Sequence, residues 1–212
     1  MKVVEIFKSI DGEGIRAGLP VTFIRLGGCN LHCSYCDTKY AWDGNYEFTD
    51  MTPEEITDKV YRMGCPRITI TGGEPLIHKD IHILINLLLY CGFWVNIETN
   101  GSVDVEPYLQ NNVIVTMDYK CPSSNMDKSM NLGNLSLLRK RDVLKFVVGS
   151  KEDLDCCRDL IKYTVANVFI SPVFGKIEPK EIVEYMLEHD MMDCRVQLQL
   201  HKYIWNPQER GV

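Results

Sequence analysis

The sequence predicts an α/β fold, a partial, trimmed (β/α) barrel with a mostly parallel sheet. Short β-branched and apolar runs alternate with segments that carry helix start signals along the 212 residues. Such alternation builds right-handed βαβ units and hence a parallel sheet covered by helices. Most runs are nearly continuous in apolar character, as expected of parallel strands buried on both faces. No repeat, low-complexity tract or Ser/Pro-rich linker divides the chain, so we expect a single domain over residues 1–212.

The strands follow from the apolar runs and their β-branched composition. They are expected at residues 21–26, 67–71, 93–98, 113–119, 142–148, 168–172 and 195–200. The link between residues 98 and 113 is too short for a full crossover helix, which is why the barrel is expected to be trimmed.

The helices are marked by residues typical of helix ends. Thr52-Pro53-Glu54-Glu55 has the pattern of a capping box with Pro at the first helical position. Ser150 and Glu178-Pro179 are expected to open two later helices in a similar way. A helix over residues 80–90 is expected to stop at Gly92.

Composition excludes several classes of protein. The formal net charge of -6 argues against a broad nucleic-acid or anionic-membrane surface. No apolar stretch approaches the roughly 20 residues of a membrane span, and no signal-peptide core is recognisable, so a cytoplasmic protein is expected. The nine cysteines are an odd number in a chain without a secretory signal, which makes a disulfide framework a poor interpretation.

Three thiols occur within eight residues, directly after the first predicted strand, at Cys29, Cys33 and Cys36. A structural zinc site normally takes four protein ligands, and His32 would be an awkward fourth because it lies between two of these cysteines. A cubane iron–sulfur cluster held by only three thiolates leaves one iron without a protein ligand. That iron is free to bind a cofactor or substrate.

The spacing CxxxCxxC, with the aromatic Tyr35 before the last cysteine, resembles the radical S-adenosylmethionine (SAM) superfamily. The resemblance implies a [4Fe-4S] cluster on Cys29, Cys33 and Cys36 whose open iron is chelated by the amino and carboxylate groups of SAM. It also implies that Tyr35, Cys36 and Asp37 contact SAM. The remaining cysteines are scattered and are interpreted as small buried hydrophobes or incidental thiols.

Polar and glycine-rich segments follow most of the predicted strands, where parallel α/β sheets form their sites. Thr71-Gly72-Gly73-Glu74-Pro75 resembles the segment with which radical enzymes bind the amino group of SAM, so Gly73 and Glu74 are assigned to the cofactor. Weaker candidates for its carboxylate, ribose and adenine are Asp118, Tyr119, Lys120, Ser171, Pro172, Val173 and Phe174.

A more specific resemblance, to the 7-carboxy-7-deazaguanine synthases, covers essentially the whole chain. It rests on residues 7–14 (FKSIDGEG), 23–30 (FIRLGGCN), 36–38 (CDT) and 197–202 (QLQLHK). It implies a radical ring contraction of 6-carboxy-5,6,7,8-tetrahydropterin to 7-carboxy-7-deazaguanine with loss of ammonia. It also implies that SAM is reused, that Mg²⁺ is required with Thr38 as its ligand, and that the protein is a homodimer.

The chemistry of the matching residues suits that substrate. The Arg25 fork fits a carboxylate, and Glu13 can accept hydrogen bonds from the pterin amino and ring N–H groups. A hydroxyl such as that of Thr38 is an acceptable donor for hard Mg²⁺. By matching position, the resemblance implies that the substrate is lined by Ile10, Asp11, Gly12, Glu13, Arg25, Thr71, His201 and the terminal carboxylate of Val212. Many relatives carry Gln where Asp11 stands.

Two alternatives use the same cysteines. An activase that installs a glycyl radical on a partner enzyme shares the cysteine spacing, but has no evident need for the Ser9–Gly14 segment or His201. A zinc-stabilised binding module would use the three cysteines and one histidine, and would hold zinc rather than iron. As a radical enzyme, the protein would need an external electron donor of the flavodoxin or ferredoxin type.

Overall fold

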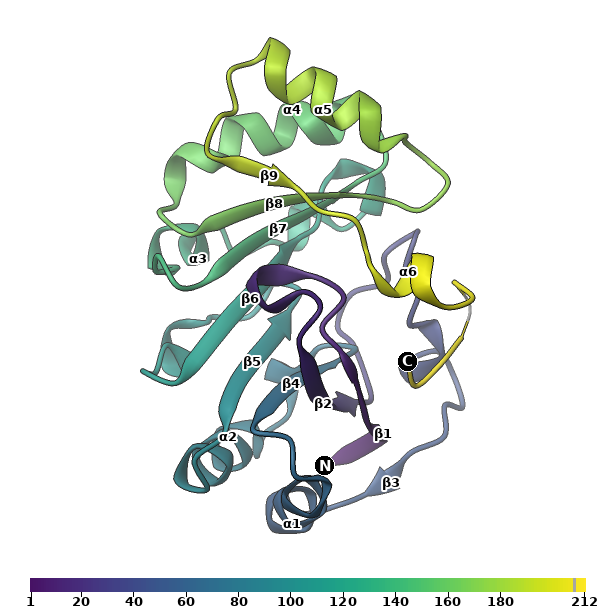
Figure 1. Ribbon diagram of the computed structural model, residues 1–212, viewed down its shortest axis with the longest axis vertical. Coiled ribbons are helices and arrows are strands. Elements are labelled where there is room, and N and C mark those ends of the chain that lie inside the picture. Colours follow the sequence, from purple (N-terminus) through teal and green to yellow (C-terminus); the bar gives the residue numbers. More distant parts are fainter. Residues whose placement is uncertain (208) are drawn as a thin grey trace.

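The protein is built on one nine-stranded sheet, shown as a computed structural model that describes residues 1–207 and 209–212 (Figure 1). The strand order is β3-β1-β2-β4-β5-β6-β7-β8-β9. The strands are β1 (Lys2–Ile10), β2 (Pro20–Leu26), β3 (Thr49–Asp50), β4 (Arg67–Gly72), β5 (Trp94–Thr99), β6 (Val113–Tyr119), β7 (Val143–Val148), β8 (Asn167–Pro172) and β9 (Cys194–Val196). The α-helices are α1 (Pro53–Met63), α2 (Ile81–Tyr90), α3 (Gly133–Leu137), α4 (Lys151–Leu160), α5 (Pro179–Glu188) and α6 (His201–Ile204).

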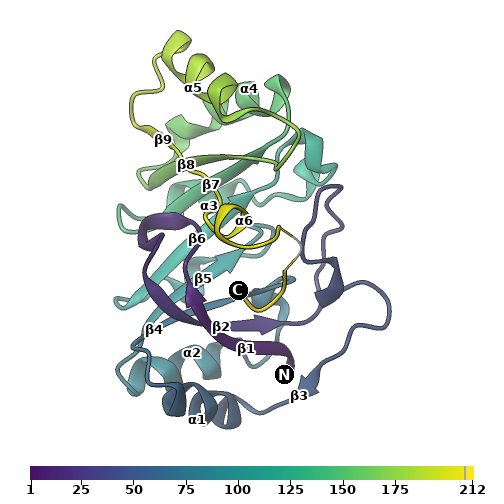
Figure 2. The same ribbon diagram turned by 45° about the vertical axis from the view of Figure 1, so that its right-hand side comes forward.

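The sheet confirms the prediction of a partial barrel. Strands β2 and β4 to β9 pair in parallel, whereas β1 pairs antiparallel with both β2 and β3. Strand order runs from β3 to β9 without closing into a ring. The long helices lie outside the curved sheet, while α6 and the C-terminal segment lie across its inner side (Figures 1 and 2). Among the described residues, no helix is long and apolar enough to cross a membrane.

The first six predicted strands are confirmed as β2 and β4 to β8, with ends shifted by a residue or so. Strand β1 was not predicted. Its sequence, KVVEIFKSI, interleaves charged and apolar residues and lacks the continuous apolar character of the parallel strands. Charged residues are tolerated there because β1 lies next to the short edge strand β3 rather than in the middle of the sheet.

The last predicted strand, over residues 195–200, is wrong beyond Val196. The Gln197 N–H still donates to the Ile170 carbonyl at 2.9 Å, but the chain then leaves β8. The Gln197 side chain turns towards the N-terminal segment, where its Oε1 accepts from the Gly14 N–H at 2.6 Å and its Nε2 donates to the Gly14 carbonyl at 3.0 Å. This amide therefore bridges the open side of the sheet in place of a further strand pair.

The predicted helix starts are confirmed. The Thr52 hydroxyl accepts from the Glu55 N–H at 3.2 Å, and the Glu55 carboxylate accepts from the Thr52 N–H at 2.8 Å, so the capping box of α1 is complete. Ser150 caps α4 by accepting from the Asp153 N–H. At α5 the Glu181 carboxylate accepts from the Glu178 N–H at 3.0 Å.

The expected stop of α2 and the trimmed link after β5 are also confirmed. Gly92 follows Cys91, the C-cap residue of α2, with a φ of 82°, the left-handed conformation that glycine adopts without strain. Between β5 and β6 the chain forms a single 3-10 turn, Glu106–Tyr108, rather than a crossover helix.

Along the central strands, successive side chains alternate between the hydrophobic core and the inner face of the sheet. In β7, Leu144, Phe146 and Val148 belong to the hydrophobic core beneath the helices. Lys145 and Val147, between them, face the inner side and line a cavity there. Because successive side chains of a strand point to opposite faces, the same division holds in β5 and β6. The sheet thus presents a polar inner surface although its outer surface is apolar.

Candidate active site

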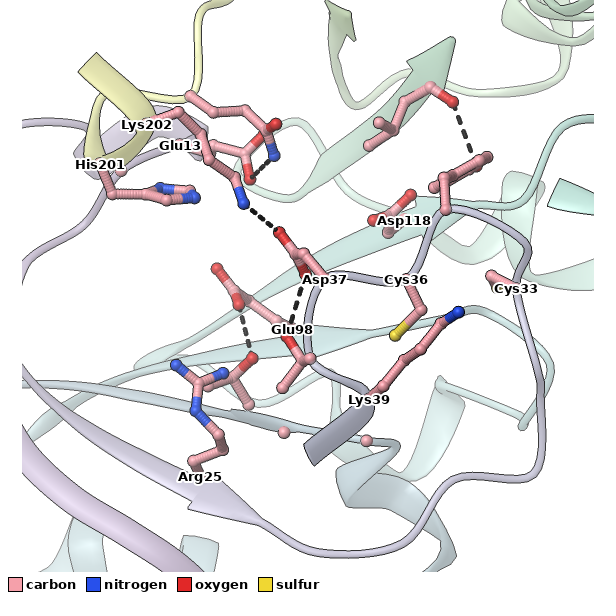
Figure 3. A pocket seen from close by; sticks show the side chains of 18 of the residues that line it. Glu13, Arg25, Cys33, Cys36, Asp37, Lys39, Glu98, Asp118, His201 and Lys202 are labelled. Atoms are coloured by element: carbon pink, nitrogen blue, oxygen red, sulfur yellow. Dashed lines mark hydrogen bonds and ion pairs between the residues drawn. The ribbon is translucent and has the colours of Figure 1, made fainter. Parts of the chain in front are cut away.

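A cavity of about 720 Å³ occupies the inner side of the sheet at the carboxyl ends of the strands (Figure 3). Its volume lies within the range typical of small-molecule sites. The N-terminal segment, the cysteine loop, the ends of β4 to β8 and the C-terminal segment all contribute to its wall. The predicted convergence of strand ends therefore produces one shared site.

The three thiols of the cysteine loop line this cavity, and none of them is in a disulfide. The Leu31 N–H lies 3.4 Å from Cys29 Sγ, and the Trp42 indole N–H lies 3.3 Å from Cys36 Sγ. N–H donors of this kind tune the thiolates that hold iron–sulfur clusters. The thiols therefore fit a [4Fe-4S] cluster with three protein ligands.

The thiols do not fit a single-ion site. Within residues 1–207 and 209–212, no three His, Cys, Asp or Glu side chains come together closely enough to hold one metal ion. A cubane instead spreads its thiolates over separate corners. Burial raises the pKa of Cys33 to about 11, although Lys120 acts against this, and burial also raises the pKa of Cys29. Metal binding must therefore displace protons from these thiols.

The cysteine loop is packed directly against the glycine segment after β4. The Gly73 N–H donates to the Leu26 carbonyl at 3.1 Å, and the Glu74 N–H donates to the Gly28 carbonyl at 2.9 Å. A Cβ on Gly73 would lie 2.5 Å from the Gly28 carbonyl carbon. Only glycine permits this approach, so Gly73 sets the distance between the two loops.

Glu74 supports that segment from below and does not line the cavity. Its side chain is fully buried, and its carboxylate accepts from Thr99 Oγ1 at 2.8 Å and from the N–H groups of Asn100 and Leu76 at 2.6 and 3.0 Å. Burial raises the pKa of Glu74 in spite of these donors. The carboxylate therefore ties the ends of β4 and β5 together beneath the thiols.

One end of the cavity carries the cations suited to a carboxylated ligand. Arg25 Nε donates to Glu5 Oε1 at 2.5 Å, and Tyr40 donates to the same oxygen at 3.0 Å. The terminal nitrogens of Arg25 point into the cavity (Figure 3). Arg210 lies 4.0 Å above the Tyr40 ring. The Arg25 guanidinium is thus held by Glu5 and by the rings of Phe7 and Tyr40, whose centroids lie 5.7 and 5.8 Å from its central carbon.

The C-terminal segment covers the cavity through polar contacts to the cysteine loop. Lys202 Nζ donates to Asp37 Oδ2 at 2.8 Å (Figure 3). Although burial opposes the charged form, the Lys202 ammonium lowers the pKa of Asp37 to about 2. His201 packs so closely on Gly12 that an added Cβ there would lie 3.3 Å from the ring Cγ. Burial lowers the pKa of His201.

A charged network forms the floor of the cavity. Lys145 Nζ lies 3.1 Å from Glu13 Oε2 and 3.3 Å from Asp118 Oδ2, and Lys120 Nζ lies 2.9 Å from that same Asp118 oxygen. Nearby, Thr71 Oγ1 donates to Glu98 Oε2 at 2.7 Å. Burial raises the pKa of Glu98, whereas Lys145 and Thr71 act in the opposite direction.

Most of the predicted site residues line the cavity: Ile10, Gly12, Glu13, Arg25, Cys29, Cys33, Tyr35, Cys36, Asp37, Thr38, Thr71, Gly73, Asp118, Lys120, Val173, Phe174, His201 and Val212. Asp11, Glu74, Tyr119, Ser171 and Pro172 do not. Asp11 instead pairs with Arg16 at 2.7 Å and accepts from Thr69, all three side chains being buried. Tyr119 follows Asp118 along β6 and therefore points to the opposite face, into the core.

The wall also contains residues that were not predicted, among them the polar side chains of Glu98, Lys145, Gln199 and Lys202. The sequence does carry a signal for Lys145, which is the single charge within the buried strand VLKFVV. A lysine in such a strand needs a partner. Gln199, which donates to Glu13 at 3.2 Å, stands in an alternating Gln-Leu pattern that was interpreted as a strand.

Comparison with known proteins identifies the class of enzyme to which this partial parallel barrel with its three-thiol loop belongs. Residues 23–189 match the family model described as the Radical SAM superfamily, so the chain belongs to that superfamily. This membership implies a [4Fe-4S] cluster and SAM, which the thiols fit. The superfamily contains many activities, and closer relatives narrow the choice.

Within that superfamily, the chain belongs to the 7-carboxy-7-deazaguanine synthase family. It is 47% identical over 218 residues to the 7-carboxy-7-deazaguanine synthase of Clostridium acetobutylicum, covering 100% of this chain and 99% of that protein. It is 42% identical to the synthase of Methanospirillum hungatei, covering 98% and 86%. The crystal structure of QueE from Escherichia coli matches with a TM-score of 0.76 and 25% identity over 93% of each chain. The glycyl-radical activase alternative is not favoured.

Proposed function

We propose that this protein is a radical SAM lyase that converts 6-carboxy-5,6,7,8-tetrahydropterin to 7-carboxy-7-deazaguanine with loss of ammonia, in 7-deazapurine biosynthesis. The observation that carries the proposal is a single cavity in which the three thiols face Arg25 and Glu13. The synthases named among the relatives support this choice of reaction.

The protein's own residues bind and orient the substrate. Arg25 would hold the pterin carboxylate through its terminal nitrogens, since its Nε already binds Glu5. Glu13 would accept from the pterin's amino and ring N–H groups, because its Oε1 is buried and accepts no hydrogen bond from the described residues. Ile10, Gly12, Thr71, His201 and the terminal carboxylate of Val212 would complete the substrate wall. Asp11 would act indirectly, through its ion pair with Arg16.

SAM would lie between the thiols and the ends of β4, β6 and β8. When bound, the cluster and SAM supply the carbon-centred radical that removes a hydrogen atom from the substrate. The Gly73 backbone and the side chains of Asp118, Lys120, Val173 and Phe174 would hold SAM, as would the segment from Tyr35 to Asp37. The chain's task is to keep the pterin C6 against the reactive carbon and to exclude other hydrogen donors.

Mg²⁺ would bind next to the substrate carboxylate, with the Thr38 hydroxyl as one oxygen ligand. Thr38 lines the cavity, and its hydroxyl donates to Asp37 Oδ1 at 3.0 Å, so its position is already fixed. Mg²⁺ usually takes few protein oxygens and keeps substrate and water in its shell. Thr38→Ala should weaken the magnesium dependence of turnover, while leaving the iron content of the protein unchanged.

The remaining parts of the proposal concern the protein's context. Residues 1–212 would act as a single radical SAM domain, paired as a homodimer, the commonest symmetric assembly. A flavodoxin or ferredoxin would supply the electron. The nine free cysteines and a thiolate-bound cluster support a reducing compartment, the cytoplasm.

The test is anaerobic reconstitution with iron and sulfide, followed by addition of a reductant, SAM, magnesium and the carboxypterin. We expect 7-carboxy-7-deazaguanine and ammonia in equal amounts, detected by mass and by an ammonia assay. The Cys33→Ala variant is the matched control, and should give neither product. Abundant 5′-deoxyadenosine without deazaguanine would show that the substrate is wrong although the radical class is right.

A further inference from the structure

Lys145 is a buried charge that the proposed chemistry does not yet use. It is the third residue of β7, and every residue of that strand is buried. Its side chain lies on the inner face and lines the cavity, with 6% of the residue exposed. An apolar side chain would be enough to fill this buried position of the strand. Burying an ammonium instead costs free energy unless carboxylates surround it. Its partners should therefore explain why a lysine stands there.

The ammonium lies between two carboxylates from different parts of the chain. Glu13 belongs to the segment after β1, and Asp118 lies on β6, directly beside Lys145 in the sheet register. Lys145 contacts one oxygen of each carboxylate, at 3.1 and 3.3 Å. It is therefore the physical link between the N-terminal wall of the cavity and the floor.

Each of these carboxylates has a second oxygen left over. Glu13 Oε1 and Asp118 Oδ1 are both buried, and neither accepts a hydrogen bond from the described residues. Buried acceptors without donors are costly, so these two oxygens are suited to donors that a ligand brings. One oxygen of each carboxylate is thus held by Lys145, together with Lys120 in the case of Asp118, while the other oxygen is left for a ligand.

The charge of Lys145 is stable rather than switchable. Burial works against the ammonium, but the carboxylates of Asp118, Glu13 and Glu98 together hold the pKa of Lys145 well above its ordinary value. An ammonium of this kind is a poor proton donor near neutral pH. The arrangement therefore favours an electrostatic clamp over a general acid.

We propose that Lys145 is a positioning residue that couples the substrate and SAM sites by holding Glu13 and Asp118 in one rigid ion triad. The assignment of Glu13 to the pterin and of Asp118 to SAM rests on the proposed function above. A change at the substrate-side carboxylate should then alter SAM binding, because both act on the same ammonium.

A double-variant cycle on the iron-loaded protein tests this coupling without any pterin. SAM affinity is measured anaerobically for the unmodified protein, Glu13→Gln, Lys145→Met and the double variant. We expect Glu13→Gln to weaken SAM binding by about tenfold, and to add little once Lys145 is already Met. Lys180→Met, on the exposed face of α5, is the matched control and should leave SAM affinity unchanged. No effect of Glu13→Gln, or independent effects that multiply in the double variant, would overturn the proposal.

Two further variants keep the result interpretable. Lys145→Arg retains the cation and should restore most of the SAM affinity, so a complete loss in this variant at full iron content would also overturn the proposal. Should Lys145→Met fail to load iron, the same cycle with Asp118→Asn reads the coupling from the other carboxylate.

A last measurement separates this inference from the reaction assignment. With carboxypterin present, Lys145→Met should raise the ratio of 5′-deoxyadenosine to deazaguanine, because SAM and substrate are no longer held in register. An unchanged ratio would contradict the clamp. If the unmodified protein makes no deazaguanine at all, the proposed reaction fails, yet the SAM cycle still decides the role of Lys145.

Discussion

Replacing Gly73 by alanine should disrupt the thiol site although it adds only one carbon. Gly73 is not among the glycines with a left-handed backbone, so alanine suffers no conformational penalty there. The effect must come from contact alone. The added Cβ would lie 2.5 Å from the Gly28 carbonyl carbon and 2.9 Å from the Cys29 Cβ.

The size of the effect follows from these distances. Non-bonded carbon atoms are in favourable contact at about 3.5 Å, so the two loops would have to separate by roughly 1 Å. Hydrogen bonds oppose this movement, since the Gly28 N–H donates to Ala41 at 2.8 Å and the Glu74 N–H donates to Gly28 at 2.9 Å. Overpacking costs roughly 1–3 kcal/mol of stability. A 1 Å displacement at a reacting centre reduces turnover by about a hundredfold.

The assay compares Gly73→Ala with Gly64→Ala. Gly64 ends α1 with a φ of 69° and has open space around its Cα, so alanine there costs only the left-handed strain, about 1–2 kcal/mol. Both variants are measured for iron and sulfide content, SAM affinity and unfolding free energy. Gly73→Ala alone should lose iron or SAM binding. If it keeps both at the level of Gly64→Ala, the close packing of the two loops does not position the thiols, and the reasoning is refuted.

Three other changes probe the buried polar groups. Asp11→Asn removes one partner of a buried ion pair, so the unfolding free energy should fall by about 3 kcal/mol while SAM affinity stays unchanged; a loss of SAM affinity at unchanged stability would contradict this. Burial raises the pKa of Glu98 in the folded protein above its ordinary 4.5. The contribution of Glu98 to folding stability is therefore complete below pH 4.5 and is lost as the pH rises through the raised pKa. In thermal melts, the stability of Glu98→Gln relative to the unmodified protein should therefore increase from pH 4.5 to 8. A stability difference that does not change with pH would exclude a raised pKa of Glu98. Trp42→Phe removes the N–H donor to Cys36 and should shift the cluster reduction potential to more negative values, whereas Trp94→Phe, on the exposed end of β5, should not.

The parallel sheet was predicted well from the sequence because continuous apolar runs are typical of parallel strands. Strand β1 escaped this criterion, since it mixes charges with apolar residues and pairs antiparallel beside a short edge strand. Residues 197–200 were mistaken for strand because Gln-Leu alternation has the right period. The side chains of Gln197 and Gln199 instead make polar contacts with Gly14 and Glu13, and these long-range contacts leave no local pattern in the sequence.

For the site, the sequence identified which loops converge but not which side chains turn inward. Asp118 and Tyr119 are adjacent at one strand end, yet only Asp118 lines the cavity because strand side chains alternate. Glu74 was assigned to SAM from its motif, and its carboxylate is fully used by protein donors. Lys145 was not predicted because site residues of parallel sheets are expected at strand ends, whereas this lysine reaches the cavity from within β7.

At the open side of the sheet, the seam between the C-terminal segment and the segment after β1 is joined by the Gln197 side chain rather than by a strand pair. Elsewhere in the sheet, separating two neighbouring strands breaks a ladder of backbone hydrogen bonds. At this seam the C-terminal segment is held by separate contacts: Gln197 bonds to Gly14, Gln199 donates to Glu13, and the Leu200 N–H donates to the Gly12 carbonyl. Each such bond contributes about 1 kcal/mol net, so substitutions at Gln197 or Gln199 should weaken this seam in small steps without removing a strand pair. The open edge of the barrel can therefore be tuned through side chains, while the paired strands fix the dimensions of the rest of the sheet.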